Sequence, residues 1–189
     1  MYPMKDRIKL PVCFDPDRLQ EDLRRLHSID WIAHFVTQNY EGDWSVIPLR
    51  GPEGATHPVM MIYSDPTCET FADTPFLKGL HYIQEVLKSL HCPLLAVRLM
   101  KLSAGSQIKE HSDLDLAAEY GTVRLHIPIH TSDDVEFILN GTRVILNEGE
   151  CWYLRLSDPH SVNNQGKSDR VHLVVDAKMN DWLQALLIA

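Results

Sequence analysis

The sequence lacks the signatures of several protein classes. Its four cysteines, Cys13, Cys68, Cys92 and Cys151, form no C-x-x-C pair, so neither a zinc knuckle nor a disulfide framework is predicted. No apolar run approaches the roughly 18 residues that a membrane-spanning helix needs. The N-terminus "MYPMKDRIKLPVCF" also lacks the apolar core of a signal peptide. We therefore expect a cytoplasmic protein with reduced thiols.

Positive charge is also scarce. The 189 residues include 18 Lys and Arg against 26 Asp and Glu, which gives a formal net charge of −8. Because there is no basic run, nothing predicts attraction to the phosphates of nucleic acids or to an anionic membrane. The expected partner is a small molecule or another protein, and the sequence leaves the oligomeric state open.

Repeats, low-complexity segments and Gly- or Ser-rich linkers are absent as well. With 44% hydrophobic residues, the chain is long enough for one sizeable core and short for two domains. We expect a single domain over residues 1–189. Within it, residues 1–93 should form helices and first strands that pack on a sheet, and residues 94–177 should form a β core.

Helical patterns are present at both ends of the chain. The stretch "DPDRLQEDLRRLHS" begins with a capping Asp15 followed by Pro16 and has leucines at helical spacing, so it predicts an amphipathic helix. "PFLKGLHYIQEVLKSL" over residues 75–90 repeats this pattern. "NDWLQALL" over residues 180–187 predicts a terminal helix.

From Leu94 onward the hydrophobic period changes to two. The short runs "LLAVRLMKL", "TVRLHIPIH", "VEFILNGTRVILN", "ECWYLRL" and "RVHLVVDA" are separated by turn residues, which is typical of an antiparallel sandwich or barrel. Asn140 and Gly141 can both adopt the positive φ of a type I′ hairpin turn. The predicted fold is mainly β with flanking helices, a double-stranded β-helix of the jelly-roll, cupin-like kind.

A metal site is the first functional hypothesis. His111 and Asp113 in "KEHSDLD" are two residues apart, so at a strand end both side chains can face one cation, although such a pair is more often a surface turn. His160 in "SDPHSV" adds a second imidazole. Two imidazoles and one carboxylate fill one face of an octahedral iron and leave three positions, which suit a bidentate 2-oxo acid and dioxygen.

Arg170 follows His160 by ten residues. The intervening "NNQGKSD" resembles a turn, and a hairpin pivoting near Gly166 would pair His160 with His172 and bring Arg170 to the same face. An arginine in a strand of Val and Leu needs an anion, and its planar fork suits a carboxylate. The alternative is a structural ion pair with a carboxylate such as Asp176.

Further cationic and imidazole side chains interrupt the apolar strands. Arg124 and His126 alternate with apolar residues in "TVRLHIPIH" and lie either on a solvated face or at the barrel mouth, beside a bound diacid. Arg98 is a single charge in "LLAVRLMKL". Because burying it without an anion is costly, we expect it to face the cavity.

These residues carry a family resemblance over roughly residues 94–177. The chain resembles the aspartyl/asparaginyl β-hydroxylase family of iron(II) and 2-oxoglutarate dependent oxygenases, and is especially similar to its bacterial L-proline cis-4-hydroxylases. The matching pieces are "RLMKLSAGSQIKEHSD", "VRLHIPI", "LNEGECWYL", "PHSVNN" and "RVHLVVD". "WSVIPLRG" at residues 44–51 resembles the family's strand and loop near the substrate pocket.

The resemblance implies a role for each matching residue. His111, Asp113 and His160 would ligate Fe(II), and Arg170 would bind the distal carboxylate of the cosubstrate 2-oxoglutarate. Arg124 and His126 would lie beside the cosubstrate or the iron. The implied enzyme is a 2-oxoglutarate-dependent dioxygenase, a hydroxylase of an unactivated C–H bond that consumes O2 and converts 2-oxoglutarate to succinate.

The substrate is predicted only as a class. The proline hydroxylases continue into a further helical segment where this chain ends at Ala189, which argues against proline itself. The animal peptide-modifying members lack the carboxylate ligand that Asp113 supplies here, and their substrate-docking repeat domain is absent, so we expect a free amino acid or related small carboxylate. The candidate contacts are Arg98 and Arg50 for its carboxylate, and Trp44 and Trp152 as pocket walls.

Two other functions stay open at this point. The same chemistry could act on an Asp or Asn side chain of a protein or peptide, or the chain could be a non-oxygenase, cupin-type metal-binding protein. Nitrogen and oxygen donors also accept Ni, Co, Zn and Mn, so the donor set does not identify the metal.

Overall fold

The computed structural model describes residues 5–63 and 67–188. The strands are β1 (Arg7–Cys13), β2 (Ile32–Ala33), β3 (Tyr40–Glu41), β4 (Trp44–Pro52), β5 (Phe71–Asp73), β6 (Leu94–Leu102), β7 (Gln107–His111), β8 (Thr122–His130), β9 (Val135–Leu139), β10 (Thr142–Val144), β11 (Glu150–Leu154), β12 (His160–Asn164) and β13 (Arg170–Lys178). The α-helices are α1 (Pro16–Arg24), α2 (Pro58–Ile62), α3 (His81–Ser89) and α4 (Asp181–Ile188), and 3-10 turns cover Ser28–Asp30, Thr37–Asn39, Pro75–Gly79 and Ala118–Tyr120.

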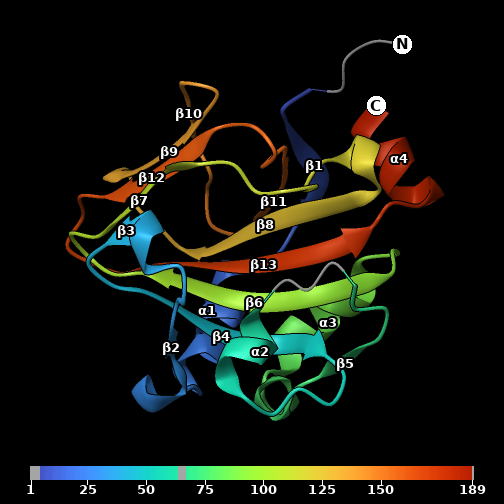
Figure 1. Cartoon of the computed structure of the whole chain (residues 1–189), viewed down its shortest axis with the longest axis horizontal. Coiled ribbons are helices and arrows are strands. Elements are labelled where there is room, and N and C mark those ends of the chain that lie inside the picture. The colour runs from blue at the N-terminus through green and yellow to red at the C-terminus, as the bar shows by residue number, and fades with distance from the viewer. Residues whose placement is uncertain (1–4, 64–66, 189) are drawn as a thin grey trace.

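The strands form two antiparallel sheets. The larger sheet has the order β1-β11-β8-β13-β6-β4-β2, with β5 paired to β4, and the smaller has the order β10-β9-β12-β7-β3. In Figure 1 the long strands β8, β13 and β6 run side by side across the middle, and the small sheet lies above them at the left. This is the mainly β, jelly-roll architecture that the sequence predicts.

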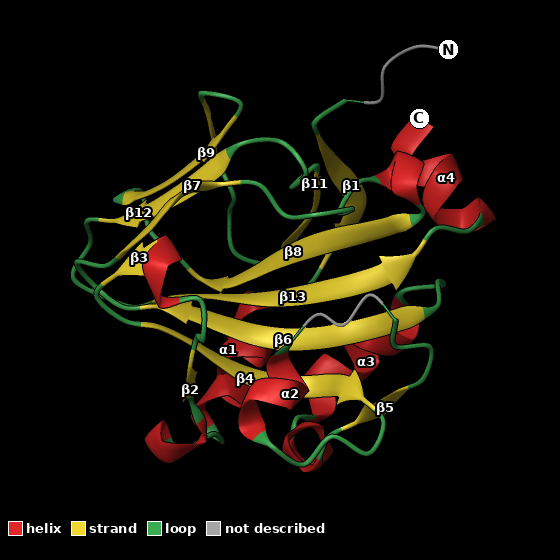
Figure 2. Ribbon diagram, viewed as in Figure 1, coloured by secondary structure: helices red, strands yellow, loops and turns green. Residues whose placement is uncertain are grey.

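The helices begin and end close to where the sequence predicts them. Asp15 caps α1, because its side chain accepts hydrogen bonds from the backbone N–H groups of Asp17 (3.0 Å) and Arg18 (3.3 Å). The stretch 75–90 is divided, since Leu80 leaves the helical region between the 3-10 turn and α3. Among the described residues no helix has the length and apolarity to cross a membrane. Figure 2 shows the helices outside the two sheets.

The first 93 residues also add strands to both sheets. β1 pairs with β11 at one edge of the large sheet, and β4 pairs with β6 in its interior. β3 pairs with β7 in the small sheet. The N-terminal half therefore extends the sheets that carry the candidate site, in addition to packing helices on them.

Successive side chains of β8 point alternately into two different cores. Val123, Leu125 and Ile127 pack in a core that the large sheet shares with α1, α3 and α4. The other face of β8 carries Arg124 and His126, both buried. This face looks toward the second core, to which both sheets contribute. That core contains Trp44, Val46, Ile62, Met100, Leu102, Ile108, Phe137, Leu139, Val144, Leu146, Leu154, Leu156, Val162 and Val174.

Two hairpin predictions have opposite outcomes. Asn140 and Gly141 have φ of 51° and 71° and connect β9 to β10, with Leu139 opposite Thr142, so the two-residue turn is confirmed. The predicted hairpin around Gly166 is wrong.

β12 pairs with β7 and β9, whereas β13 pairs with β6 and β8 in the other sheet. His160 therefore lies opposite His111, and His172 lies opposite Met100. The physical reason is that the turn at residues 165–169 carries the chain from one sheet to the facing sheet. A local turn pattern does not distinguish such a crossing from a hairpin.

Candidate metal centre and anion pocket

The three predicted metal ligands lie together. His111 is the last residue of β7, Asp113 follows it, and His160 begins the neighbouring strand β12, directly opposite His111. Candidate ligand atoms of the three side chains all lie within 4.8 Å of one another. The two imidazole centroids are 4.4 Å apart, and His111 Nε2 is 3.6 Å from Asp113 Oδ1. Strand pairing thus brings together side chains that are almost fifty residues apart.

Backbone carbonyls orient both imidazoles. His111 Nδ1 lies 2.8 Å from the carbonyl oxygen of Lys109, and His160 Nδ1 lies 2.9 Å from that of Asp158. Because a carbonyl only accepts, each Nδ1 must carry the proton in these contacts. Each Nε2 therefore keeps its lone pair for a metal, the arrangement that ligating histidines commonly use.

Arg124 orients the third ligand. Its Nη1 donates to Asp113 Oδ2 over 2.9 Å, which leaves Oδ1 on the side of His111. Arg124 is itself held by Asp176, which accepts from its Nε (2.6 Å) and its Nη2 (2.9 Å). The carboxylate ligand thus has a support as fixed as those of the two imidazoles.

The donor set fits a resident Fe(II). Two imidazole nitrogens and one carboxylate oxygen converge from two adjacent strands and the turn after one of them, and no further His, Cys, Asp or Glu joins this group within the described part of the chain. Such a set leaves positions for other ligands, as non-heme iron oxygenases require.

A buried charge cluster surrounds Asp176. Arg98, with 1% of its surface exposed, donates from Nη1 to Asp176 Oδ2 over 3.0 Å, so the carboxylate binds two guanidinium groups. Although burial alone would raise it, Arg124 and Arg98 hold the pKa of Asp176 at about 2. For Arg124 the burial effect is outweighed by Asp176 and Asp113, so its pKa is raised, whereas burial lowers the pKa of Arg98.

Arg170 lies in a different environment. It is 3% exposed, and its Nη2 donates to His172 Nδ1 over 2.8 Å. Within residues 5–63 and 67–188 no carboxylate pairs with it, and its Nε is buried without a hydrogen-bond partner. Burial therefore lowers the pKa of the Arg170 guanidinium. The alternative of an ion pair between Arg170 and Asp176 is wrong.

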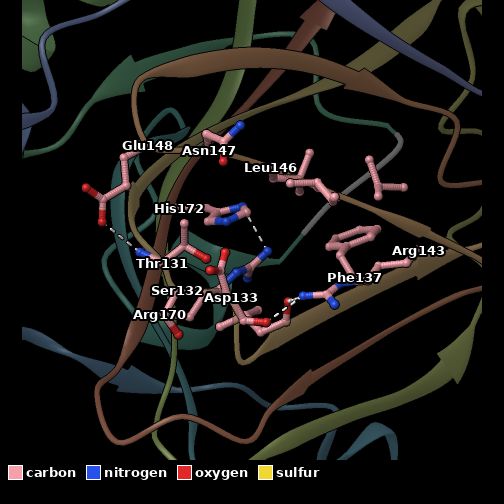
Figure 3. A pocket seen from close by; sticks show the side chains of 13 residues that line it. Thr131, Ser132, Asp133, Phe137, Arg143, Leu146, Asn147, Glu148, Arg170 and His172 are labelled. Atoms are coloured by element: carbon pink, nitrogen blue, oxygen red, sulfur yellow. Dashed lines mark hydrogen bonds between the residues drawn. The ribbon is translucent and has the colours of Figure 1, made fainter.

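Arg170 and His172 line a cavity of about 230 Å³. Figure 3 shows the two side chains joined by their hydrogen bond among the lining residues. Phe137 also lines this cavity, and its ring is parallel to that of His160 at a centroid distance of 6.2 Å. The cavity is therefore adjacent to His160, a predicted metal ligand. The other lining residues are Thr131, Ser132, Asp133, Val135, Arg143, Val144, Ile145, Leu146, Asn147 and Glu148.

His126 lies between these two regions. Its Nδ1 is 3.1 Å from His172 Nδ1, and its ring is 5.9 Å from that of Phe137. Its Nε2 is buried and has no hydrogen-bond partner among the described residues. Burial first, and then the positive charges of Arg170 and Arg124, lower the pKa of His126 well below its ordinary value.

The predicted substrate contacts are spread over three places. Trp44 is buried and stacks on His34 at 3.7 Å, with ring planes 5° apart. Trp152 donates to Glu150 and packs against the second core. Arg50 of β4 forms an ion pair at 2.8 Å with Asp73, its partner on the neighbouring strand β5. A role in substrate binding stays a prediction for all four residues, Arg50, Arg98, Trp44 and Trp152.

Sequence reasoning missed the roles of two residues. Asp176 interrupts an apolar strand, which is the same signal that points to Arg98, but the sequence suggests it only as a partner for Arg170. His34 in "WIAHFV" carries no signal of its own. Burial, followed by the charges of Arg98 and Arg124, lowers its pKa to about 4, and its ring stacks on that of Trp44.

Comparison with known protein families shows which family the chain belongs to. The model of the aspartyl/asparaginyl beta-hydroxylase family matches residues 15–179, most of the chain. The chain belongs to this family. The match to the family extends well beyond residues 94–177, where most of the sequence motifs lie, and includes β2, β4 and β5 of the large sheet and β3 of the small sheet.

The chain is also similar in sequence to L-proline cis-4-hydroxylase of Rhizobium meliloti (strain 1021). It is 27% identical over 183 residues, which cover 93% of this chain and 62% of the relative. This chain thus spans less than two thirds of that protein's length.

Solved structures share the fold at low identity. A 2OG-Fe(II) oxygenase family oxidoreductase from Burkholderia pseudomallei is 14% identical, with a TM-score of 0.56 over 93% of this chain and 86% of its own. A non-heme monooxygenase, solved as a nickel complex, is 15% identical, with a TM-score of 0.51 over 93% of this chain and 74% of its own. They confirm the predicted fold class.

Proposed function

We propose that the protein is an Fe(II)- and 2-oxoglutarate-dependent dioxygenase. It hydroxylates a C–H bond of a free amino acid or related small carboxylate and converts 2-oxoglutarate and O2 to succinate and CO2. The observation that carries this proposal is the combination of an open-faced triad of His111, Asp113 and His160 with a buried Arg170 that has no internal carboxylate partner among the described residues.

Fe(II) bound by the triad would supply the oxygen chemistry, with one oxygen atom entering succinate and the other the new hydroxyl group. The residues of the chain supply binding and orientation. Arg170 binds the distal carboxylate of 2-oxoglutarate, and Arg124 and His126 lie beside the cosubstrate on the metal side of the cavity. Phe137 and the apolar residues of the second core exclude water from the space between the sheets.

The substrate is proposed to bind on the side of Arg98 and Trp44. Arg98 is linked to the metal ligand Asp113 through Asp176 and Arg124, so its positive charge lies close to the metal centre. The stack of Trp44 on His34 provides a flat wall. The name of the Rhizobium relative, an L-proline hydroxylase, supports a small amino acid rather than a peptide. Arg50 and Trp152 remain further candidate contacts.

A cupin-type protein without oxygenase activity is less well supported. It would be favoured by a fourth protein ligand or by an Arg170 engaged in a structural ion pair. Neither feature is found in the described residues. The four free cysteines and the need for ferrous iron suit the reducing cytoplasm, which is the compartment we propose.

An anaerobic titration tests the cosubstrate assignment. Adding Fe(II) and then 2-oxoglutarate to the protein should produce the visible metal-to-ligand charge-transfer band of the chelated 2-oxo acid. A panel of free amino acids and of Asp- and Asn-containing peptides is then scored for stimulated succinate release. No band would contradict the cosubstrate. A band with turnover stimulated only by peptides would contradict the choice of a free substrate.

Asp113→Ala tests the metal centre. Removing the carboxylate leaves two imidazoles, so we expect substrate-coupled succinate release to fall by at least about 100-fold. The thermal unfolding midpoint should stay close to that of the wild type, because Asp113 is a partly exposed turn residue. The matched control is Glu110→Ala, which removes an exposed carboxylate beside His111 and should leave turnover unchanged. Full activity of Asp113→Ala would rule out the triad.

A further inference from the structure

The imidazole of His172 makes buried contacts that the proposed metal triad does not explain. The side chain is 1% exposed and lines the cavity that also contains Arg170. Its Nδ1 is approached by two groups at once, Arg170 Nη2 at 2.8 Å and His126 Nδ1 at 3.1 Å. His172 Nδ1 is therefore the atom that both the buried guanidinium of Arg170 and the buried imidazole of His126 contact.

The hydrogen-bond inventory determines where the protons lie. A guanidinium has only donors, so His172 Nδ1 must be the acceptor of the bond from Arg170 and cannot carry a proton. Its one proton then lies on Nε2. The contact with His126 requires that His126 donate from Nδ1 to the same lone pair. Burial and the charge of Arg170 lower the pKa of His172 well below its ordinary value, which agrees with a neutral ring.

The remaining N–H of His172 is available to a ligand. Within the described part of the chain, Nε2 of this ring makes no hydrogen bond, although the side chain lines the cavity. Arg170 Nε is likewise without a partner. The two side chains thus present a cationic donor and a neutral donor to one space, and no carboxylate among the described residues pairs with Arg170. Such a pair matches the several acceptor positions of one carboxylate group.

We propose that His172 binds the distal carboxylate of the cosubstrate through Nε2–H, while its Nδ1 fixes the guanidinium of Arg170 for the same group. This inference rests on the proposed use of 2-oxoglutarate. It makes His172 a determinant of cosubstrate specificity, because only a 2-oxo acid with a second carboxylate reaches this donor. A 2-oxo monoacid of the same length, such as 2-oxopentanoate, would not use it.

Two substitutions separate the two ring nitrogens. His172→Phe keeps a ring of similar size and removes both polar atoms. His172→Asn places an amide near the Nδ1 position, where its oxygen can still accept from Arg170, and removes the donor at the Nε2 position. His81→Gln changes an exposed histidine at the start of α3 and serves as the control. Titration of each Fe(II)-loaded protein under anaerobic conditions measures the affinities for 2-oxoglutarate and for 2-oxopentanoate.

Loss of a hydrogen bond to a charged group predicts that His172→Phe weakens 2-oxoglutarate binding by about 10-fold or more, and that His172→Asn weakens it less. Affinity for 2-oxopentanoate should stay at the wild-type value in both variants. If His172→Phe does not fold, His172→Asn carries the test. Wild-type affinity for 2-oxoglutarate in the variants, or an equal loss for both acids, would overturn the inference alone. A wild-type protein that binds no 2-oxoglutarate would overturn the proposed function as well.

Discussion

Two buried arginines of this protein differ in how their charge is compensated. Arg124 makes three hydrogen bonds to the carboxylates of Asp176 and Asp113, and its pKa is raised. Arg170, which is also buried, has an imidazole as its hydrogen-bond partner, and burial lowers its pKa. The first charge is neutralised within the fold and holds the side chain of Asp113, a proposed metal ligand. The second has no carboxylate partner among the described residues, and we propose that it binds an anion from outside the protein.

The largest expected effect comes from breaking the neutralised cluster. Asp176→Asn leaves Arg98 and Arg124 buried without their shared carboxylate, which should lower the free energy of unfolding by about 3–5 kcal/mol. Urea unfolding of the metal-free protein measures this. Asp73→Asn breaks the exposed ion pair with Arg50 and should cost less than about 1 kcal/mol. Similar losses in both variants would contradict the distinction.

The second prediction concerns the arginine without a carboxylate. Arg170→Met removes a desolvated charge and fills the space with an apolar chain, so the free energy of unfolding should rise by about 1–3 kcal/mol. We expect added 2-oxoglutarate to raise the unfolding midpoint of the wild type and to leave that of Arg170→Met unchanged. Arg25→Met, at the exposed C-cap residue that follows α1, is the control for both measurements. A destabilised Arg170→Met that still responds to 2-oxoglutarate would show that Arg170 is structural.

Acid should weaken the fold through the neutral imidazoles. The pKa of His34 is lowered to about 4, so between pH 6.5 and 4 the unfolded chain binds a proton there that the folded chain does not. Stability must then fall as the pH falls, by at most about 1.4 kcal/mol per pH unit for this residue. His126 and His172 act in the same direction. Urea unfolding of metal-free His34→Phe should show a shallower loss between pH 7 and pH 5 than the wild type.

Much of the site could be predicted because its candidate ligands lie in short, recognisable sequence motifs. His111 and Asp113 share one motif at a strand end, and His160 follows a Pro turn, so each ligand is recognisable where it stands. Their convergence agrees with the prediction. The pairing of His160 with His172 could not be deduced, because the turn near Gly166 has the same local composition whether the chain returns in one sheet or crosses to the facing sheet.

The charge network around the site was harder to predict for a different reason. Arg98, Arg124 and Asp176 each interrupt an apolar strand, and the sequence shows that each needs a partner. The strands β6, β8 and β13 that carry them are adjacent in the large sheet, with Asp176 directly opposite Arg124. That adjacency is a property of the sheet order, which depends on tertiary packing rather than on any local pattern. For the same reason, the sequence puts His172 on the same face of its strand as Arg170 but gives neither its partner strand nor its hydrogen bonds.

The carbonyl groups that hold His111 and His160 belong to the main chain two residues before each imidazole. Every amino acid brings that oxygen, whatever its side chain. A substitution at position 109 or 158 therefore leaves in place the oxygen that accepts from each ring. Side chains around the site can then change in charge and shape while the orientation of the two imidazoles is kept. One scaffold held in this way can accommodate different substrates.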